Sequence, residues 1–232
     1  MSRIITFARE TGTRCHVVHL SSGKAAELIS DARETAPITV ETCSHYLLLD
    51  EDDLVRIGPK ARCGPPLRPR ETINLLWDHL LDGSIDMLAS DHCPHLPEAK
   101  AVGEESIWKA GMGLTGIQTT VPLLFSEGVV KCGLPLHEFA RLTAAAPAQI
   151  FGLYPKKGTV APGSDADLVF YDAGEEWTIR GADFPGVAKW TPFEGTGCTG
   201  RVVRTMVRGT QVFRAGSIMV EAGYGRFQRA VA

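Results

Sequence analysis

The sequence predicts an α/β protein in which alternating strands and helices are followed by a smaller, strand-rich part. Up to about residue 100, short apolar runs rich in β-branched residues alternate with amphipathic stretches of helical period. From residue 156 onward, turn-forming pairs such as Pro162-Gly163 and Arg208-Gly209 separate short alternating runs, as in antiparallel β domains. We therefore expect βα units and C-terminal helices in 1–155 and a small β domain in 156–232.

Three strands are expected in the first part. They lie within 14–20 ("RCHVVHL"), within 37–49 ("PITVETCSHYLLL", which includes the exit from the strand) and at 84–89 ("SIDMLA"). The stretch after the first strand is a helix, with Ser21 or Ser22 as its candidate N-cap. Strands that alternate with helices at this spacing are typical of a parallel sheet.

The other helices are expected from their apolar periodicity. Residues 1–12 place Ile4, Ile5 and Ala8 on one face of a helix, and an amphipathic helix beginning near residue 71 is stopped by Gly83. The stretches 114–129 and 134–153 are also expected to be helical, and Pro147 fits the first turn of a short extra helix.

Composition excludes several classes of protein. The 232 residues are 44% hydrophobic and 22% charged, with a net charge of −3 and no block of like charges, so a nucleic-acid or membrane-surface partner has no electrostatic support. No apolar run approaches the roughly 20 residues of a membrane helix, and the N-terminus lacks the apolar core of a signal peptide. Six scattered cysteines without a CxxC pair indicate reduced thiols and a cytoplasmic enzyme.

Residues with coordinating side chains stand at the ends of the first and third strands. His19 closes the first strand, and Asp91 follows the third in "SDHCPH" (90–95). Functional groups of parallel α/β folds gather at the carboxyl ends of the strands, so both side chains should reach the same edge. On spacing alone, His19 could also be a hydrogen-bonded structural histidine and Asp91 a helix cap or part of a turn.

Several motifs, in order and spacing, resemble the cyclic amidohydrolases, the family that includes allantoinase, D-hydantoinase, dihydropyrimidinase and dihydroorotase. They are "VVHLSS" (17–22), "ETCSHYLLL" (41–49), "CGPPLR" (63–68), "SDHCPH" (90–95), "GLYPKKGTVAPGSDADLV" (152–169) and "KWTPFEG" (189–195). The resemblance extends from about residue 10 to about residue 215. The motifs "GLYPKKG" and "KWTPFEG" are most similar to allantoinase and hydantoinase.

This resemblance implies a TIM-like (β/α)₈ barrel, a metal-dependent hydrolase of which the chain would hold the C-terminal part, strands 6–8, followed by the C-terminal part of a composite β-sandwich. The family centre holds two divalent metals, usually zinc, bridged by a carboxylated lysine and a hydroxide. The strand-1 "HxH" pair, the strand-4 lysine and the strand-5 histidine have no counterpart here. We therefore expect a truncated product, a misassigned start or one piece of a split enzyme that is inactive alone. The family also implies homo-oligomers.

The family's functional residues fall on a few positions of this sequence. The strand-6 histidine, a metal ligand, falls on His19, and the strand-8 aspartate, both ligand and proton shuttle, falls on Asp91. Main-chain groups that bind the cyclic substrate fall near Gly64 and near Met112–Gly113. His95 corresponds to the histidine that helps dihydroorotase hold a carboxylate.

Two further histidines are expected to be structural. His16 lies at an odd offset from His19 and should face the other side of its strand, and His45 is expected to belong to a loop.

The implied activity is hydrolysis of a cyclic amide C–N bond, with allantoin favoured and hydantoin or dihydropyrimidine next. One alternative is a dihydroorotase. Another is a non-catalytic assembly protein, because relatives of dihydropyrimidinase that have lost metal ligands serve in that role. The retention of His19 and Asp91 makes this last alternative the least favoured.

Overall fold

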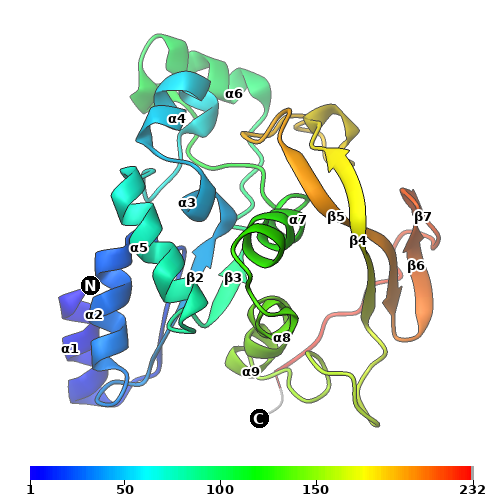
Figure 1. Ribbon diagram of the computed structural model, residues 1–232, viewed down its shortest axis with the longest axis horizontal. Coiled ribbons are helices and arrows are strands. Elements are labelled where there is room, and N and C mark those ends of the chain that lie inside the picture. The colour runs from blue at the N-terminus through cyan, green and yellow to red at the C-terminus, as the bar shows by residue number, and fades with distance from the viewer. Residues whose placement is uncertain (231–232) are drawn as a thin grey trace. The chain divides into compact units, whose positions relative to one another are not determined.

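The computed structural model describes residues 1–230, which form two units, each built from two stretches of the chain (Figure 1). The first comprises Met1–Val121 with Ile179–Thr196, and the second comprises Pro122–Thr178 with the chain from Gly197 onward. This division differs from the predicted boundary after residue 155. The helices that follow Pro122 belong to the same compact unit as the β-sheet, and 179–196 returns to the first unit.

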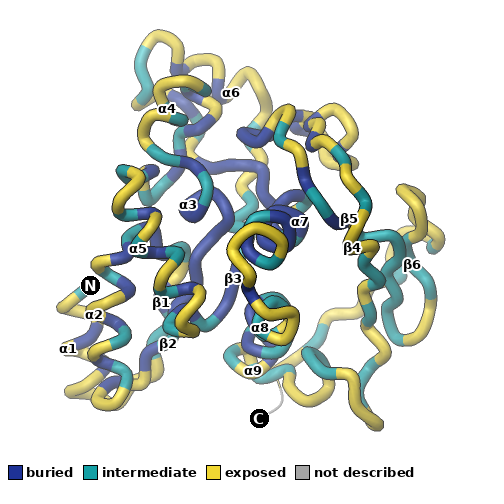
Figure 2. The backbone as a smooth tube through the Cα atoms, viewed as in Figure 1, coloured by how far each residue is buried: buried dark blue, intermediate teal, exposed yellow. Residues whose placement is uncertain are grey.

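A parallel sheet forms the centre of the first unit. Its strands are β1 (Cys15–Val17), β2 (Ile38–Cys43) and β3 (Met87–Ala89), in the order β1-β2-β3. The three predicted strands and their parallel pairing are therefore confirmed. Buried residues are concentrated along β2 and β3, where Val40 and Cys43 are fully buried (Figure 2). Because all three strands are parallel, their carboxyl ends lie at one edge of the sheet.

Two of the predicted helices pack against each other beside this sheet. They are α2 (Gly23–Ala32) and α5 (Arg70–Leu81), which bury Ile29 and Leu76 completely. Gly23 permits the contact, because a Cβ at this position would lie 2.6 Å from Cβ of Leu75. Ser22 is the N-cap residue of α2, as predicted, although its side chain makes no capping hydrogen bond.

The remaining elements of the first unit are shorter. They are α1 (Ser2–Thr11), α3 (Ser44–Leu48), α4 (Glu51–Ile57), η1 (Gly58–Ala61), α6 (Pro97–Ala101), η2 (Val102–Glu104), η3 (Ile107–Lys109) and η6 (Gly181–Asp183). No helix within residues 1–230 is long and apolar enough to cross a bilayer.

The second unit joins helical segments to an antiparallel sheet. Its strands are β4 (Leu168–Thr178), β5 (Gly197–Val207), β6 (Thr210–Arg214) and β7 (Ser217–Ile218), in that order. Helical segments α7 (Thr120–Leu123), η4 (Leu124–Lys131), α8 (Leu136–Ala140), η5 (Arg141–Ala145) and α9 (Ala146–Ile150) precede the sheet. The helix predicted at 114–129 begins only at Thr120, because 114–119 forms a bridge and turns, and it continues into the π-helical segment η4. The helix predicted at 134–153 is realised as α8, η5 and α9, and Pro147 lies in the first turn of α9 as predicted.

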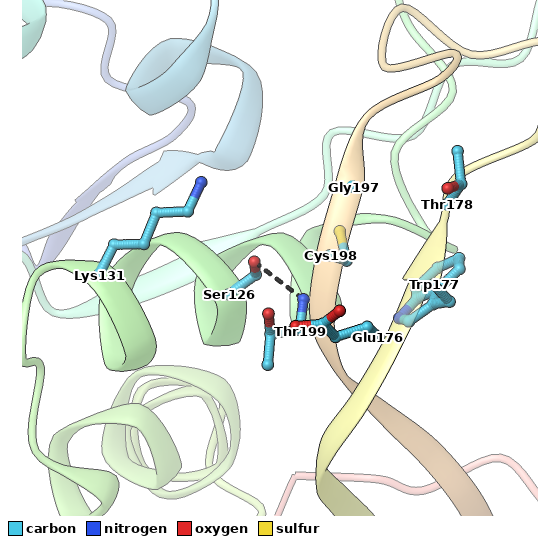
Figure 3. Close-up of a pocket in the computed structure, with 8 residues that line it drawn as sticks. All are labelled: Ser126, Lys131, Glu176, Trp177, Thr178, Gly197, Cys198 and Thr199. Carbon is cyan, nitrogen blue, oxygen red and sulfur yellow. Dashed lines mark hydrogen bonds between the residues drawn. The ribbon is translucent and has the colours of Figure 1, made fainter.

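A shallow pocket of about 380 Å³ lies in the second unit, lined by η4, β4 and β5 (Figure 3). The polar side chains that line it are paired, buried or exposed to solvent. Lys131 pairs with Glu127, the Ser126 hydroxyl accepts a hydrogen bond from the N–H of Thr199, and burial raises the pKa of Cys198 to about 11. The thiol of Cys198 is therefore protonated at physiological pH, and the carboxylate of Glu176 in the pocket lining is exposed.

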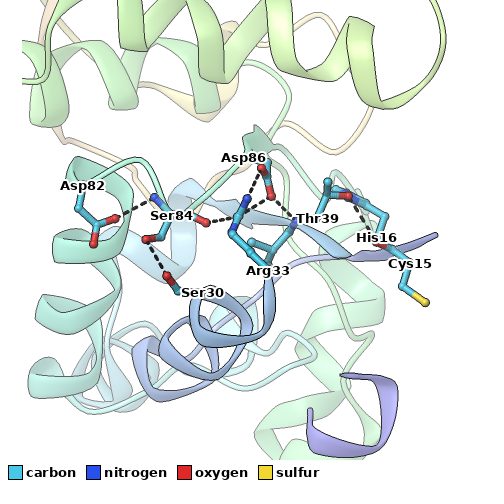
Figure 4. A network of polar contacts seen from close by, with 9 residues as sticks. Cys15, His16, Ser30, Arg33, Thr39, Asp82, Ser84 and Asp86 are labelled. Atoms are coloured by element: carbon cyan, nitrogen blue, oxygen red, sulfur yellow. Dashed lines mark hydrogen bonds and ion pairs between the residues drawn. The ribbon is translucent and has the colours of Figure 1, made fainter. Parts of the chain in front are cut away.

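The amino end of β3 is fixed by an ion pair between Arg33, which caps the end of α2, and Asp86, which directly precedes β3 (Figure 4). The Arg33 guanidinium donates to both carboxylate oxygens of Asp86, at 2.9 and 2.8 Å, and also to the carbonyl of Ser84. The same carboxylate accepts a hydrogen bond from the N–H of Val40 in β2. This bidentate pair therefore joins a helix to two strands at the edge opposite the strand ends that carry His19 and Asp91.

Replacing Arg33 by Met should lower the free energy of unfolding by about 2 kcal/mol, because the largely buried Asp86 carboxylate loses its charged partner. Urea denaturation would measure the loss. The matched control is Arg56→Met, because Arg56 pairs with Asp53 at the surface and its side chain is 68% exposed. The control should change stability by less than about 0.5 kcal/mol. Equal effects of the two substitutions would contradict the structural role of Arg33.

Candidate functional site

The structure places His19 and Asp91 at equivalent positions after two strands of the same sheet. His19 follows the last residue of β1 by two positions, and Asp91 follows the last residue of β3 by two positions. Both have left-handed backbones, with φ of 40° and 43°. This conformation is costly for residues with a Cβ and persists where the surroundings impose it, most often at functional sites.

A buried carboxylate on the intervening strand connects the two strand ends. Glu41 of β2 is 8% exposed, and its Oε1 accepts a hydrogen bond from the N–H of His19 at 3.3 Å. Its Oε2 lies 3.2 Å from Nε2 of His16, whose Nδ1 lies 2.8 Å from the Thr39 hydroxyl. His16 was expected to face the other side of its strand, but its ring contacts the same carboxylate that accepts the hydrogen bond from the backbone of His19.

The electrostatics of Asp91 reflect this environment. Burial raises the pKa of its carboxyl group, the neighbouring His19 lowers it, and Glu41 raises it again. His19, Glu41 and Asp91 are therefore close enough to influence one another. The structure brings together the two predicted metal ligands and adds an acidic neighbour that the sequence motifs did not single out.

His45 was expected in a loop, and this expectation is wrong. It lies in α3, directly after β2, and is 2% exposed. Burial, together with the nearby His19, lowers its pKa to about 3, so the imidazole stays neutral at physiological pH. Within residues 1–230, its Nε2 is buried without a hydrogen-bond partner. The strand exit turns into a helix whose first four residues are buried and which packs against α5 and β2.

The donors at this edge suit a divalent metal such as zinc. Nδ1 of His19 is buried and has no hydrogen-bond partner among the described residues, and Asp91 supplies a carboxylate beside it. Neutral imidazole and carboxylate are both common zinc ligands. Within residues 1–230, no group of three or more His, Cys, Asp or Glu side chains could hold a metal ion. The residues present therefore fit part of a metal centre.

Gly64 and Gly113, the predicted substrate contacts, lie where loops pack closely. A Cβ on Gly64 would lie 2.7 Å from Sδ of Met112, and a Cβ on Gly113 would lie 2.5 Å from Cβ of Cys93. Gly113 also has a φ of 139°, which side chains rarely adopt. Gly113 is thus required by packing and by its backbone conformation, whereas a side chain at Gly64 would only have to displace the exposed Met112 side chain. These contacts bring the segments of Gly64, Cys93 and Met112–Gly113 together.

His95 belongs to the same group of loops. Its Nε2 lies 3.0 Å from the Met112 carbonyl, to which it must donate, and 3.5 Å from Sγ of Cys93. Its ring packs against Gly111. The neighbouring His92 instead accepts hydrogen bonds at Nδ1 from the N–H groups of Gly116 and Ile117. His95 is therefore bound to the loop that carries Gly113, and His92 to the turn beyond it.

A buried lysine, Lys100, contacts the segment that contains Gly64, and the sequence motifs did not indicate it. Lys100 is 1% exposed, and its Nζ donates to the Arg62 carbonyl at 2.9 Å. Burial lowers its pKa to about 8, while nearby Cys63 and Cys93 raise it and Arg62 lowers it further.

This lysine gives a prediction for stability against pH. The unfolded chain keeps the Lys100 proton up to about pH 10.5, whereas the folded protein releases it near pH 8, so the unfolded state binds more protons between these values. Stability should therefore rise with pH across this window, by at most about 3 kcal/mol. Urea denaturation at a series of pH values between about 7.5 and about 10.5 would measure the rise. An unchanged slope in Lys100→Met would contradict the assignment to Lys100.

Known proteins match this chain over almost its whole length. The model of the amidohydrolase family matches residues 2–212. An L-hydantoinase from Paenarthrobacter aurescens is 39% identical over 98% of this chain and 50% of its own length. An allantoinase from Rubrobacter xylanophilus is 41% identical over 99% of this chain and 50% of its own length.

Solved structures agree in fold. The L-hydantoinase (dihydropyrimidinase) from Arthrobacter aurescens superimposes with a TM-score of 0.95 at 39% identity, over 97% of this chain and 50% of that one. The D-hydantoinase (dihydropyrimidinase) from Thermus sp. gives a TM-score of 0.93 at 35% identity, again over about half of its own chain. The chain thus spans about half the length of the relatives that it matches. It belongs to the amidohydrolase family.

Proposed function

We propose that this chain supplies part of the active site of an enzyme that hydrolyses the C–N bond of a cyclic amide, with allantoin as the favoured substrate and hydantoin or dihydropyrimidine next. The observation that carries the proposal is the pairing of His19 and Asp91, two left-handed residues at one edge of the sheet, with the buried Nδ1 of His19 unpaired among residues 1–230. The names of the relatives, allantoinase and hydantoinase, support the substrate class.

In this proposal β1, β2 and β3 correspond to strands 6–8 of a TIM-like barrel, and the antiparallel sheet corresponds to part of a β-sandwich. The chain would provide two ligands, His19 and Asp91, of a binuclear zinc centre and would be inactive alone, since no group of three or more suitable side chains lies within residues 1–230. A cytoplasmic homo-oligomer is the form in which we expect the complete enzyme.

Bound zinc would polarise the scissile carbonyl and lower the pKa of a water molecule. The proton transfers would be carried out by a residue of this chain, Asp91. The Asp91 carboxylate accepts a proton from the attacking water as its oxygen bonds to the carbonyl carbon. It then passes that proton to the ring nitrogen as the C–N bond breaks, so Asp91 ends the cycle ionised. His19 would hold metal through its unpaired Nδ1.

The loops of Gly64 and Gly113 would bind the ring through main-chain atoms. The N–H of Gly113 already donates to the Arg62 carbonyl at 3.1 Å, so its contact with a substrate would come from its carbonyl oxygen. A carbonyl acceptor suits the N–H groups of a hydantoin or allantoin ring.

His95 distinguishes these rings from dihydroorotate, which carries a carboxylate. Because Nε2 of His95 is engaged with the Met112 carbonyl, we expect His95→Ala to raise KM for allantoin or hydantoin by less than about fivefold. For a substrate with a carboxylate paired to His95, KM should rise by about 100-fold. Steady-state kinetics with both substrates would measure the difference. Faster hydrolysis of dihydroorotate than of allantoin, with a strict need for His95, would contradict the favoured substrate.

The proposed function can be tested by complementation. The chain would be co-expressed with the half of the Paenarthrobacter L-hydantoinase that it does not match, in the presence of zinc. Ring opening of allantoin, hydantoin and dihydroorotate would then be followed. We expect activity in the mixture and none in either part alone. A purified, zinc-loaded complex without activity on any of the three rings would contradict the proposal.

A further inference from the structure

The buried lysine behind the candidate substrate loops has an unusual set of contacts. Lys100 is 1% exposed, and no ion pair to a carboxylate is formed by it among residues 1–230. Its ammonium instead donates to the Arg62 carbonyl and lies 5.4 Å from the centre of the Trp190 ring. Burying an ammonium without a counter-ion is costly, so an uncharged, flexible side chain such as methionine would fill the same space at a lower cost. Packing alone therefore does not explain why a lysine occupies this position.

The contacts of Lys100 lead to two of the candidate substrate segments. Arg62 precedes Gly64 by two residues, and its carbonyl accepts from both Nζ of Lys100 and the N–H of Gly113. One carbonyl oxygen thus joins the Gly64 segment to the Gly113 segment, and the ammonium holds that oxygen in place. The Arg62 guanidinium strengthens the junction, since it donates to the carbonyls of Trp108 and Ala110.

The contacts of Trp190 lead to the third segment. Its Nε1–H donates to the His95 carbonyl at 2.8 Å, and its ring is 5% exposed. The Thr115 hydroxyl, just beyond Gly113, donates to the carbonyl of Trp190. All these bonds end on main-chain atoms, so the pair constrains the path of the backbone itself.

We propose that Lys100 and Trp190 are positioning residues that hold the segments of Gly64, His95 and Gly113 in a single arrangement suited to binding the cyclic amide. Their connection to substrate rests on the proposed function, whereas the clamping of the loops does not. Lys100 is too deeply buried to touch a substrate, and it acts through the Arg62 carbonyl.

Amide hydrogen exchange on the chain as it exists tests the clamp. In Lys100→Met, exchange at Gly113 should accelerate about tenfold or more, because the carbonyl that accepts its N–H loses its anchor. The N–H of Leu20, bonded to the carbonyl of Glu41 beside His19, should be unchanged. The matched control is Lys109→Met, because Lys109 pairs with Glu105 at the surface and its side chain is 60% exposed.

A second variant keeps an aromatic ring at position 190 but removes the indole N–H, with some loss of ring volume. Trp190→Phe should accelerate exchange at His95, whose N–H donates to the Cys93 carbonyl, because this segment loses the indole donor that anchors the His95 carbonyl. The effect at Gly113 should be smaller. Exchange that rises equally at Leu20, Gly113 and His95 in these variants would show general destabilisation and overturn the clamp. Unchanged exchange at Gly113 in Lys100→Met would overturn it as well.

Kinetics of the complemented enzyme test the connection to substrate. Lys100→Met should raise KM for the cyclic amide about tenfold while kcat falls less than about threefold, since the groups that transfer protons are untouched. A fall in kcat with KM unchanged would overturn the positioning role. If the unaltered complex opens no ring while Lys100→Met still loosens Gly113 alone, the proposed function fails and the clamp stands.

Discussion

Asp91→Asn should reduce turnover of the complemented enzyme by about a thousandfold or more, because the amide can neither accept the proton of the attacking water nor replace the carboxylate as a metal ligand. The position leaves little room for compensation. Asp91 has a left-handed backbone at the end of β3, and its carboxyl group is near His19 and Glu41. Initial rates of ring opening at saturating substrate would measure the effect.

The control for this charge change is Asp52→Asn, on the exposed first turn of α4. It should leave turnover within about twofold of the unaltered protein. If Asp91→Asn retained more than about a tenth of the activity, Asp91 would not be the proton carrier.

His19→Ala should lower the zinc content of the complemented enzyme and turnover together, with zinc affinity falling by about 100-fold or more. Nδ1 of His19 is buried and unpaired within residues 1–230, so a metal is the partner that its position suits. Zinc retained after dialysis against a weak chelator, measured by elemental analysis, would report the loss.

The matched control is His137→Ala, because His137 lies on α8 with its side chain 79% exposed. It should leave zinc content unchanged. Equal zinc in His19→Ala and the unaltered enzyme, with activity lost, would mean that His19 acts in another way.

The parallel sheet could be predicted because its information is local. Each strand is a short apolar run that alternates with an amphipathic helix, and parallel strands bring their carboxyl ends to one edge. His19 and Asp91 could therefore be placed together from two short stretches of sequence. The left-handed turn at each residue could not be predicted, since neither is glycine.

Helix α4 shows a local signal that was present but missed. Asp50 accepts a hydrogen bond from the N–H of Asp53, and the Asp53 carboxylate accepts one from the N–H of Asp50, which forms a capping box. The spacing of these two aspartates before Leu54 and Ile57 could have indicated the helix.

Other features depend on contacts that are distant in sequence. Lys100 is buried by contacts with Arg62 and Trp190, which are distant from it in the sequence. No pattern around position 100 distinguishes it from an exposed lysine. Glu41 shares this property, because its partners lie on the neighbouring strand. The return of 179–196 to the first unit likewise follows from long-range packing, which the composition of that segment does not reveal.

The central claim, that His19 and Asp91 hold a catalytic metal, is tested most directly by anomalous X-ray diffraction at the zinc edge from crystals of the complemented enzyme. The account predicts a zinc peak about 2.0–2.2 Å from Nδ1 of His19, with the Asp91 carboxylate in the same coordination sphere. Zinc coordinated elsewhere, with neither side chain within about 3 Å of an anomalous peak, would contradict it.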